Sequence, residues 1–234
     1  MALVKRPNMS QPVPIRHAAT IIVLRDAETA PTVLMGQRGA KAAFMPGKFV
    51  FPGGAMDTAD ADIPVHPIAA PCADRLADRT DVPPNAITVA ALRELWEETG
   101  QILGHAAIWD DPPDGWQGFA AQGYIPNAAA LTFWFRAITP SGAPRRFDAR
   151  FFLADAADLC TDPDDFSGAE DELSHLQWIP LKDARSFDLP FITQVVLAEV
   201  IANLPHLGPP KNVPFFENND ELHLVRQLGG AGPL

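Results

Sequence analysis

The chain has 234 residues, of which 47% are hydrophobic and 20% are charged, a composition typical of a folded globular protein. Its 18 basic and 29 acidic residues give a formal charge of −11, which disfavours nucleic acid as a partner, and no apolar run is long enough for a membrane helix. The first 17 residues lack the apolar core of a signal peptide, so we expect a cytoplasmic protein that does not bind a membrane.

The first elements predicted along the chain are short strands. Residues 18–24 (AATIIVL) form a β-branched run that predicts a buried strand, and residues 32–35 (TVLM) predict its hairpin partner. Residues 49–51 predict a third strand, which Pro52-Gly53-Gly54 should end. The acidic stretch that follows, from 57 to 84, is predicted to be a loop-like insertion.

A helical pattern covers residues 86–99 (AITVAALRELWEET), with Asn85 as the expected N-cap and Gly100 as the expected C-terminal cap. Later segments predict three strands and a core-facing helix, at 130–138, 149–154, 176–179 and 191–204. We therefore expect an N-terminal extension (1–16), one domain (17–204) with an insertion at about 61–84, and a C-terminal extension (205–234).

Three carboxylates fall on one side of the predicted helix. At about 100° per residue, Glu94, Glu97 and Glu98 share one sector, opposite an apolar face. A solvated acidic face is the simplest interpretation, but like charges at this spacing repel each other near the negative end of the helix dipole. Hard oxygen ligands without histidine or cysteine neighbours suit Mg²⁺ or Mn²⁺, which favours chemistry on a diphosphate.

The same residues resemble a known sequence motif. The segment 93–100 (RELWEETG) is similar to the second half of the box of Nudix hydrolases, which reads Gly, five residues, Glu, seven residues, then Arg-Glu-apolar-any-Glu-Glu-any-Gly. Residues 51–54 (FPGG) resemble the opening of that box, so that Gly54 takes the glycine position and Asp60 the usual glutamate position. However, 32 residues separate Asp60 from Arg93 where the family has seven.

An interrupted box of this kind is similar to that of the peroxisomal-type coenzyme A diphosphatases. Flanking segments at 34–38, 44–54, 138–152 and 170–180 also resemble that subgroup. The resemblance covers roughly residues 18–204 and implies an α/β protein, a Nudix-type α/β/α sandwich around a mixed, curved β-sheet.

The resemblance also implies roles for individual residues. Glu94, Glu97 and Glu98 would bind one or more Mg²⁺ ions, with Mn²⁺ as a substitute, and Arg93 would orient a box carboxylate. A carboxylate outside the box often assists as base or ligand in this family, and Glu170 and Glu172 are the candidates here. Each of these two could equally be a solvated loop charge.

A set of basic residues and the glycine turn are predicted to bind the substrate. Arginine pairs suit an additional phosphate, such as the 3′-phosphate of coenzyme A, although a basic rim that merely offsets the acids is an equal alternative. The predicted set is Arg38, Lys41, Lys48, Gly53, Gly54, Arg145, Arg146 and Arg150.

The leading functional hypothesis is a Mg²⁺-dependent hydrolase that cleaves coenzyme A or acyl-CoA to 3′,5′-ADP and (acyl-)phosphopantetheine. A pyrophosphatase for ADP-ribose, NADH or another nucleoside diphosphate derivative is the alternative enzyme. A catalytically silent Nudix fold that senses nucleotides is an alternative of another class. We expect a small-molecule substrate and a monomer or homodimer.

Overall fold

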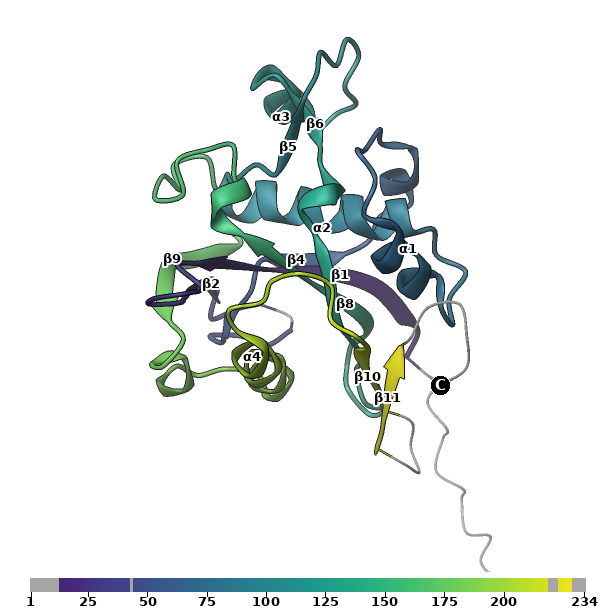
Figure 1. Ribbon diagram of the computed structural model, residues 1–234, viewed down its shortest axis with the longest axis vertical. Helices are drawn as coiled ribbons and strands as arrows, with labels where there is room; N and C mark the ends of the chain where they lie inside the picture. Colours follow the sequence, from purple (N-terminus) through teal and green to yellow (C-terminus); the bar gives the residue numbers. More distant parts are fainter. Residues whose placement is uncertain (1–12, 43, 219–222, 229–234) are drawn as a thin grey trace, which may run out of the picture.

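The computed structural model describes residues 13–42, 44–218 and 223–228, and a mixed sheet of nine described strands runs through it (Figure 1). Its central path is β11-β10-β7-β8-β1-β2-β3, with β4 attached to β1 and β9 to β2. The strands are β1 (Ile15–Arg25), β2 (Thr32–Arg38), β3 (Phe49–Val50), β4 (Gly53–Ala55), β7 (Thr132–Ile138), β8 (Arg146–Asp155), β9 (Leu173–Pro180), β10 (Val213–Asn218) and β11 (His223–Leu228).

Strand β1 is the centre of the sheet. It pairs in parallel with β8 from Ile15 opposite Arg146 to Leu24 opposite Asp155, and antiparallel with β2 at its far end. Both faces of β1 are covered, which explains the continuous apolar run that predicted it. The antiparallel pair of β7 and β8 likewise matches the two strands predicted at 130–138 and 149–154.

Helical layers cover the two faces of the sheet. Helix α2 (Pro84–Thr99) packs against β1 on one face, and α4 (Phe191–Asn203) lies on the opposite face (Figure 1). Leu92 and Leu95 belong to the core on the α2 side, whereas Val196 and Val200 belong to the core on the α4 side. The predicted α/β class and the sandwich around a mixed sheet are therefore confirmed.

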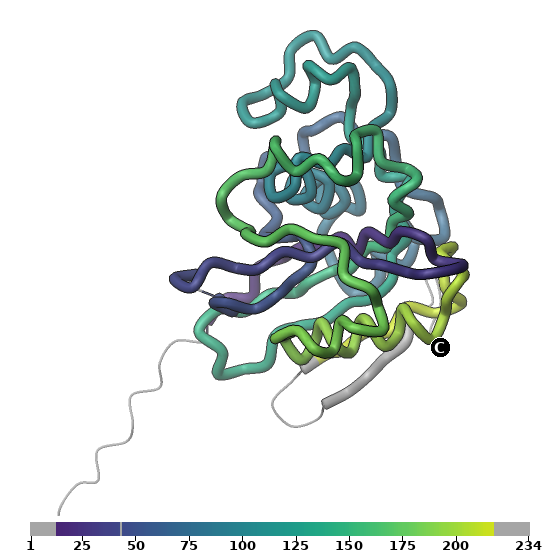
Figure 2. The backbone as a smooth tube through the Cα atoms, turned by 90° about the vertical axis from the view of Figure 1, so that its left-hand side faces the viewer, coloured from purple at the N-terminus to yellow at the C-terminus, as the bar shows by residue number. Residues whose placement is uncertain are grey.

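A small unit projects from the α2 side of the molecule (Figure 2). It consists of β5 (Gly104–Ala106), α3 (Gln117–Ala121) and β6 (Tyr124–Pro126). Trp116 and Phe119 pack with Trp96 of α2 and fasten this unit to the helix. None of its elements was predicted, because its strands are only three residues long.

The structure corrects two expectations around the predicted helix. Helix α2 begins at Pro84 rather than after Asn85, because proline is well accommodated in the first helical turn. The segment 61–84 is not loop-like throughout, since it contains α1 (Ala70–Ala77), whose Cys72 and Leu76 are buried. At the C-terminal end, Gly100 adopts a left-handed conformation with φ of 71°, as the capping pattern predicted.

Two other segments join the sheet where a turn and an extension were expected. Gly53 and Gly54 end the short strand β3 but lie in β4, opposite Thr20 and Ala19 of β1. From the segment 205–234, β10 pairs in parallel with β7 and antiparallel with β11. Among the described residues, no helix is long and apolar enough to span a membrane.

Candidate active site

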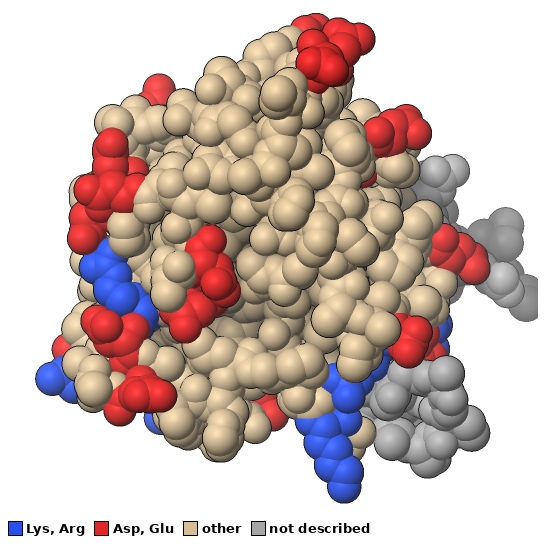
Figure 3. All heavy atoms as spheres, turned by 45° about the horizontal axis from the view of Figure 1, so that its top comes forward, with Lys and Arg blue, Asp and Glu red and all other residues tan. Residues whose placement is uncertain are grey.

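Helix α2 presents the three predicted glutamates close to β4. Glu94 and Glu98 are buried, with 8% and 2% of their surface exposed, while Glu97 is partly exposed. Two of these acids are therefore shielded from solvent, which the interpretation as a solvated acidic face does not explain. Figure 3 shows that much of the α2 side of the molecule is uncharged and that its acidic groups are scattered.

Arg93 is the organising cation of this site. Its Nη1 donates to Glu94 Oε1 and to Glu97 Oε2, each at 2.9 Å. Its Nε donates to Asp60 Oδ1 at 3.0 Å, and its Nη2 donates to Asp60 Oδ2 at 3.2 Å and to the carbonyl oxygen of Ala55 at 2.9 Å. One guanidinium thus joins α2, β4 and the short 3₁₀ helix at 58–62.

Asp60, at the usual glutamate position of the box, is a buried partner of Arg93. It is 2% exposed and, besides Arg93, its Oδ2 accepts a hydrogen bond from the Asp57 amide at 2.8 Å. A side chain one methylene shorter than glutamate reaches Arg93 because the local 3₁₀ turn brings its backbone close to the helix.

The two glycines of β4 permit close contact with the glutamates. The Gly53 amide donates to Glu98 Oε2 at 2.7 Å. A Cβ atom at Gly53 would lie 2.5 Å from the carbonyl oxygen of Ala19, and one at Gly54 would overlap the Glu94 carboxylate. A larger residue at Gly54 would therefore separate β4 from α2, and one at Gly53 would separate β4 from β1.

Burial raises the pKa values of all three glutamates. It raises the pKa of Glu94 to about 7, even though Arg93 partly offsets the effect. Burial also raises the pKa of Glu97, and it raises that of Glu98 well above the usual range despite the hydrogen bond from Gly53. The site therefore gathers more carboxyl groups than its single arginine pairs with, and burial favours their protonated form when no cation is bound.

The carboxylate oxygens of the three glutamates suit a hard cation, although their present arrangement does not surround a cation position. Glu98 Oε1 is buried and has no hydrogen-bond partner among the described residues, so an oxygen ligand remains available. Within the same part of the chain, no three acidic, histidine or cysteine side chains are close enough together to hold a metal ion as they stand. Arg93 pairs with one oxygen of Glu94 and one of Glu97, and these contacts keep the carboxylates from converging on a common point.

The two acids predicted outside the box lie beside it. The backbone amide of Glu170 donates to the carbonyl oxygen of Glu97 at 2.8 Å. The charge of the Glu170 carboxylate contributes to the raised pKa of Glu97. The exposed Glu172 carboxylate pairs with Arg38 at 2.9 Å, and its charge contributes to the raised pKa values of Glu94 and Glu98.

A cavity of about 770 Å³ adjoins this site on the α4 side of the sheet. Gly53, Gly54 and Glu94 line one part of it, and Glu172 lies there too. Most of the remaining wall is apolar. Its aromatic members are Phe44, Phe51, Phe147, Phe151, Phe191 and Phe216.

Only two of the predicted basic residues line this cavity, Arg38 and Arg145. Lys41 is exposed outside it. Lys48 also lies outside and forms an ion pair with Asp188. Arg146 does not line the cavity either, because its Nε donates to the carbonyl oxygen of Thr139 at 3.0 Å.

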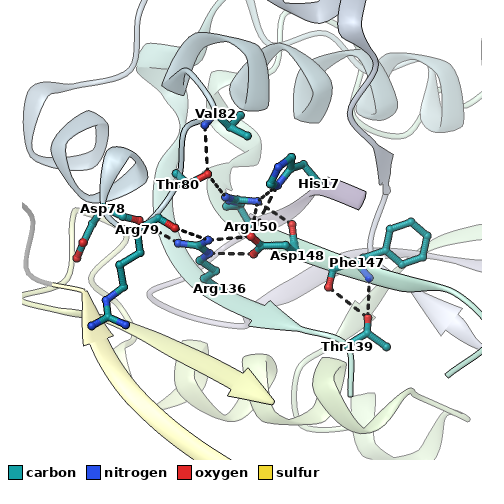
Figure 4. Close-up of polar contacts among 10 residues, drawn as sticks. All are labelled: His17, Asp78, Arg79, Thr80, Val82, Arg136, Thr139, Phe147, Asp148 and Arg150. Atoms are coloured by element: carbon teal, nitrogen blue, oxygen red, sulfur yellow. Dashed lines mark hydrogen bonds and ion pairs between the residues drawn. The ribbon is translucent and has the colours of Figure 1, made fainter. Parts of the chain in front are cut away.

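Arg150 is buried on the opposite face of the sheet, with 1% of its surface exposed, which corrects its prediction as a residue in contact with substrate (Figure 4). Its Nη1 donates to the Asp148 carbonyl oxygen at 2.8 Å and its Nη2 to Thr80 Oγ1 at 3.0 Å. Arg136 also donates twice to the Asp148 carboxylate, at 2.9 and 2.8 Å. Strand alternation places Arg150 with this network, whereas Ala149 and Phe151 line the cavity.

Arg16 lines the cavity and was not among the predicted residues. Ala18 and Thr20 of β1 line it as well, so the alternation of the strand extends to Arg16. The predicted strand began at residue 18 and the predicted extension ended at residue 16, so Arg16 was expected outside the domain. The structure places it in β1, which begins at Ile15.

No protein-family model matches the chain. A Caenorhabditis elegans protein with the assigned name nudix hydrolase 7 is 32% identical over 186 residues, covering 72% of this chain and 52% of the worm protein, so the chain spans about half the length of that curated relative. A crystal structure of a NUDIX hydrolase from Alicyclobacillus acidocaldarius is 30% identical with a TM-score of 0.62, and the match covers 82% of this chain and 93% of the bacterial chain.

Proposed function

The chain belongs to the Nudix hydrolase family, and from this premise we propose that it hydrolyses the diphosphate linkage of a nucleoside diphosphate derivative. The observation that carries the proposal is the set of shielded glutamates on α2 beside the glycines of β4, at one part of a large cavity. A cluster of buried carboxyl groups next to a substrate-sized cavity favours a site that works with a divalent cation, whose binding would displace their protons.

Glu94, Glu97 and Glu98 would hold Mg²⁺, or Mn²⁺ in its place. A bound divalent ion would polarise the diphosphate and lower the pKa of an attacking water. Arg93 keeps the Glu94 and Glu97 side chains in place through its two hydrogen bonds at 2.9 Å, and Asp60 holds Arg93 from the other side. Arg93 is therefore a positioning residue in this proposal.

Glu170 and Glu172 are proposed as the groups that accept a proton from water or complete the ligand set. Glu172 is better placed toward the substrate, because its side chain lines the cavity while that of Glu170 does not. Arg38 holds the Glu172 carboxylate beside the box through an ion pair at 2.9 Å. Arg38 also lines the cavity and is proposed to contact a phosphate of the substrate.

We propose coenzyme A or acyl-CoA as the substrate, with 3′,5′-ADP and (acyl-)phosphopantetheine as products. The interrupted box supports this choice, since it resembles that of coenzyme A diphosphatases. The apolar wall of the cavity also supports it, because it suits a long uncharged group attached to the diphosphate. ADP-ribose and NADH are alternative substrates, and a silent nucleotide sensor remains the alternative function.

The experiment is product analysis by mass spectrometry. Purified protein with Mg²⁺ is incubated separately with coenzyme A, an acyl-CoA, ADP-ribose and NADH, and Glu97→Gln is the matched inactive control. Release of 3′,5′-ADP that is lost in the variant is the expected result. Cleavage of ADP-ribose or NADH alone would overturn the coenzyme A assignment, and calorimetric binding without turnover of any substrate would favour the sensor.

A further inference from the structure

The cavity has a second charged end, formed by Arg16 and Arg145. Both side chains are exposed, and neither forms a hydrogen bond or an ion pair in the part of the chain that the structure describes. Arg38, in contrast, is already paired with Glu172 at 2.9 Å. Two unneutralised guanidinium groups therefore line the same cavity of a protein whose net charge is −11.

The strand register brings these two arginines together. Arg16 lies opposite Phe147 in the parallel pair of β1 and β8, so Arg145 precedes that partner by two residues. Two residues along a strand span about 7 Å and neighbouring strands are about 4.8 Å apart, so two long side chains can reach one ligand group. This convergence follows from the backbone pairing of β1 and β8.

The backbone that carries Arg145 is held firmly. The turn between β7 and β8 is closed by Thr139, whose amide donates to the Phe147 carbonyl oxygen at 2.8 Å, while its Oγ1 accepts from the Phe147 amide at 3.0 Å (Figure 4). Arg146 adds its bond to the Thr139 carbonyl oxygen. Pro140 and Pro144 restrict the turn between these contacts.

Residue positions along β1 give the distance between the box and the Arg16 end of the cavity. Gly54 lies opposite Ala19, and Glu94 lies against Gly54, so the box sits at the level of Ala19. Arg16 is three residues earlier, which places it about 10 Å away along the strand. The aromatic rings of Phe44 and Phe147, 5.2 Å apart, lie at the Arg16 end of the cavity.

We propose that Arg16 and Arg145 bind a second phosphate, a monoester carried on the ribose of the nucleotide whose diphosphate lies at the box. Aromatic rings suit the nucleobase, and paired guanidiniums suit a dianionic phosphate. The proposal rests on the proposed function, because it takes the box as the diphosphate end. It assigns specificity for a ribose phosphate to Arg16, a residue outside the predicted basic set.

Binding without turnover tests the pair separately from the reaction. Isothermal titration calorimetry without Mg²⁺ compares 5′-AMP, 3′,5′-ADP and 2′,5′-ADP on the full chain. The additional ribose phosphate should lower the dissociation constant at least tenfold relative to 5′-AMP. Whichever of 3′,5′-ADP and 2′,5′-ADP binds more tightly identifies the ribose position at which the phosphate is recognised. Arg16→Gln and Arg145→Gln should each remove most of this gain, while Arg185→Gln, an exposed arginine outside the cavity, should keep it. Equal binding of all three nucleotides, or a gain that both variants retain, would overturn the proposal.

Kinetics give a second readout if the chain hydrolyses coenzyme A. Arg16→Gln should lower kcat/KM for coenzyme A about tenfold or more, mainly through KM, and leave that for 3′-dephospho-CoA unchanged. Equal losses for both substrates would contradict the assignment. If no substrate is hydrolysed, the proposed function fails while the calorimetric comparison still decides the role of Arg16 and Arg145.

Discussion

At the scale of single residues, the ion pair between Asp60 and Arg93 decides whether the box keeps its geometry. Asp60→Asn removes one of the three carboxylates that pair with a largely buried guanidinium, and we expect a loss of about 2 kcal/mol in the free energy of unfolding. Asp60→Glu keeps the charge and should cost much less. Urea unfolding measures both, and equal destabilisation by the two variants would show that shape rather than charge matters there.

The raised pKa of Glu94 predicts how the metal-free protein responds to pH. A carboxyl group with a pKa of about 7 in the folded chain and near 4.5 when unfolded binds its proton more tightly when folded. Its contribution to stability is therefore complete at low pH and is lost as the pH rises toward 7, with a slope of at most about 1.4 kcal/mol per pH unit.

The matched variant for this pH dependence is Glu94→Gln, which cannot ionise. Urea unfolding in the presence of a chelator, from pH 5 to 8, should show a shallower decline for this variant than for the wild type. Identical slopes for the two proteins would mean that Glu94 does not titrate in this range.

Residue roles also show where sequence reasoning reaches its limit. The periodicity of the helix placed Glu94, Glu97 and Glu98 together, since those positions depend on local geometry alone. Arg150 was misassigned because the cavity-facing side of its strand is set by distant packing, and Arg16 was missed because β1 begins three residues before the predicted strand. Local alternation defines two faces of a strand, but it does not say which one borders the substrate.

At the scale of elements, the buried charged side chains of β7 and β8 hold residues 78–80, which belong to the segment inserted in the box. Arg136 donates to the carbonyl oxygens of Asp78 and Arg79, and Arg150 donates to Thr80, so both arginines hold the segment after α1 (Figure 4). Asp148 is the carboxylate between them. Hydrogen bonds from Arg136 and the charge of Arg150 outweigh burial and hold the pKa of Asp148 below its usual value.

Asp148→Asn should therefore destabilise the protein by about 3 to 5 kcal/mol, because it leaves two buried guanidiniums without a counter-charge. The matched control is Asp164→Asn, which removes an exposed ion pair with Arg25 and should cost less than about 1 kcal/mol. The midpoints of urea unfolding compare the two. Limited proteolysis should cut Asp148→Asn first near residues 78–82, and wild-type protection there would contradict a fastening role.

Elements differ in how far the sequence predicted them. Strand β1 and helix α2 were predicted from strong patterns, an apolar run and a capped amphipathic repeat. Helix α1 was missed because its eight residues lie in an acidic stretch rich in alanine and proline, where burial of Cys72 and Leu76 supplies what local propensity does not. Strand β10 was missed because its pairing partner, β7, lies far away in the sequence.

At the scale of the whole molecule, the layers around the sheet place opposite charges at the two ends of one cavity. Glu94 of the box and Glu172 beside it line one end, and Arg16 of β1 and Arg145, just before β8, line the other. A divalent cation would reverse the local charge at the box and make both ends attractive to phosphate. Cation binding and substrate binding should therefore favour each other.

Addition of Mg²⁺ should stabilise the entire fold, because a cation that binds only the folded box shifts unfolding by mass action. At a hundredfold excess over its dissociation constant, the gain is about 2.7 kcal/mol. Thermal unfolding with and without Mg²⁺ measures it. The gain should be smaller at pH 6 than at pH 8, since the ion must displace protons that the buried glutamates retain at the lower pH. Glu98→Gln should lose most of it, whereas Glu199→Gln on α4 should keep it. An equal gain in both variants would place the cation elsewhere on the protein.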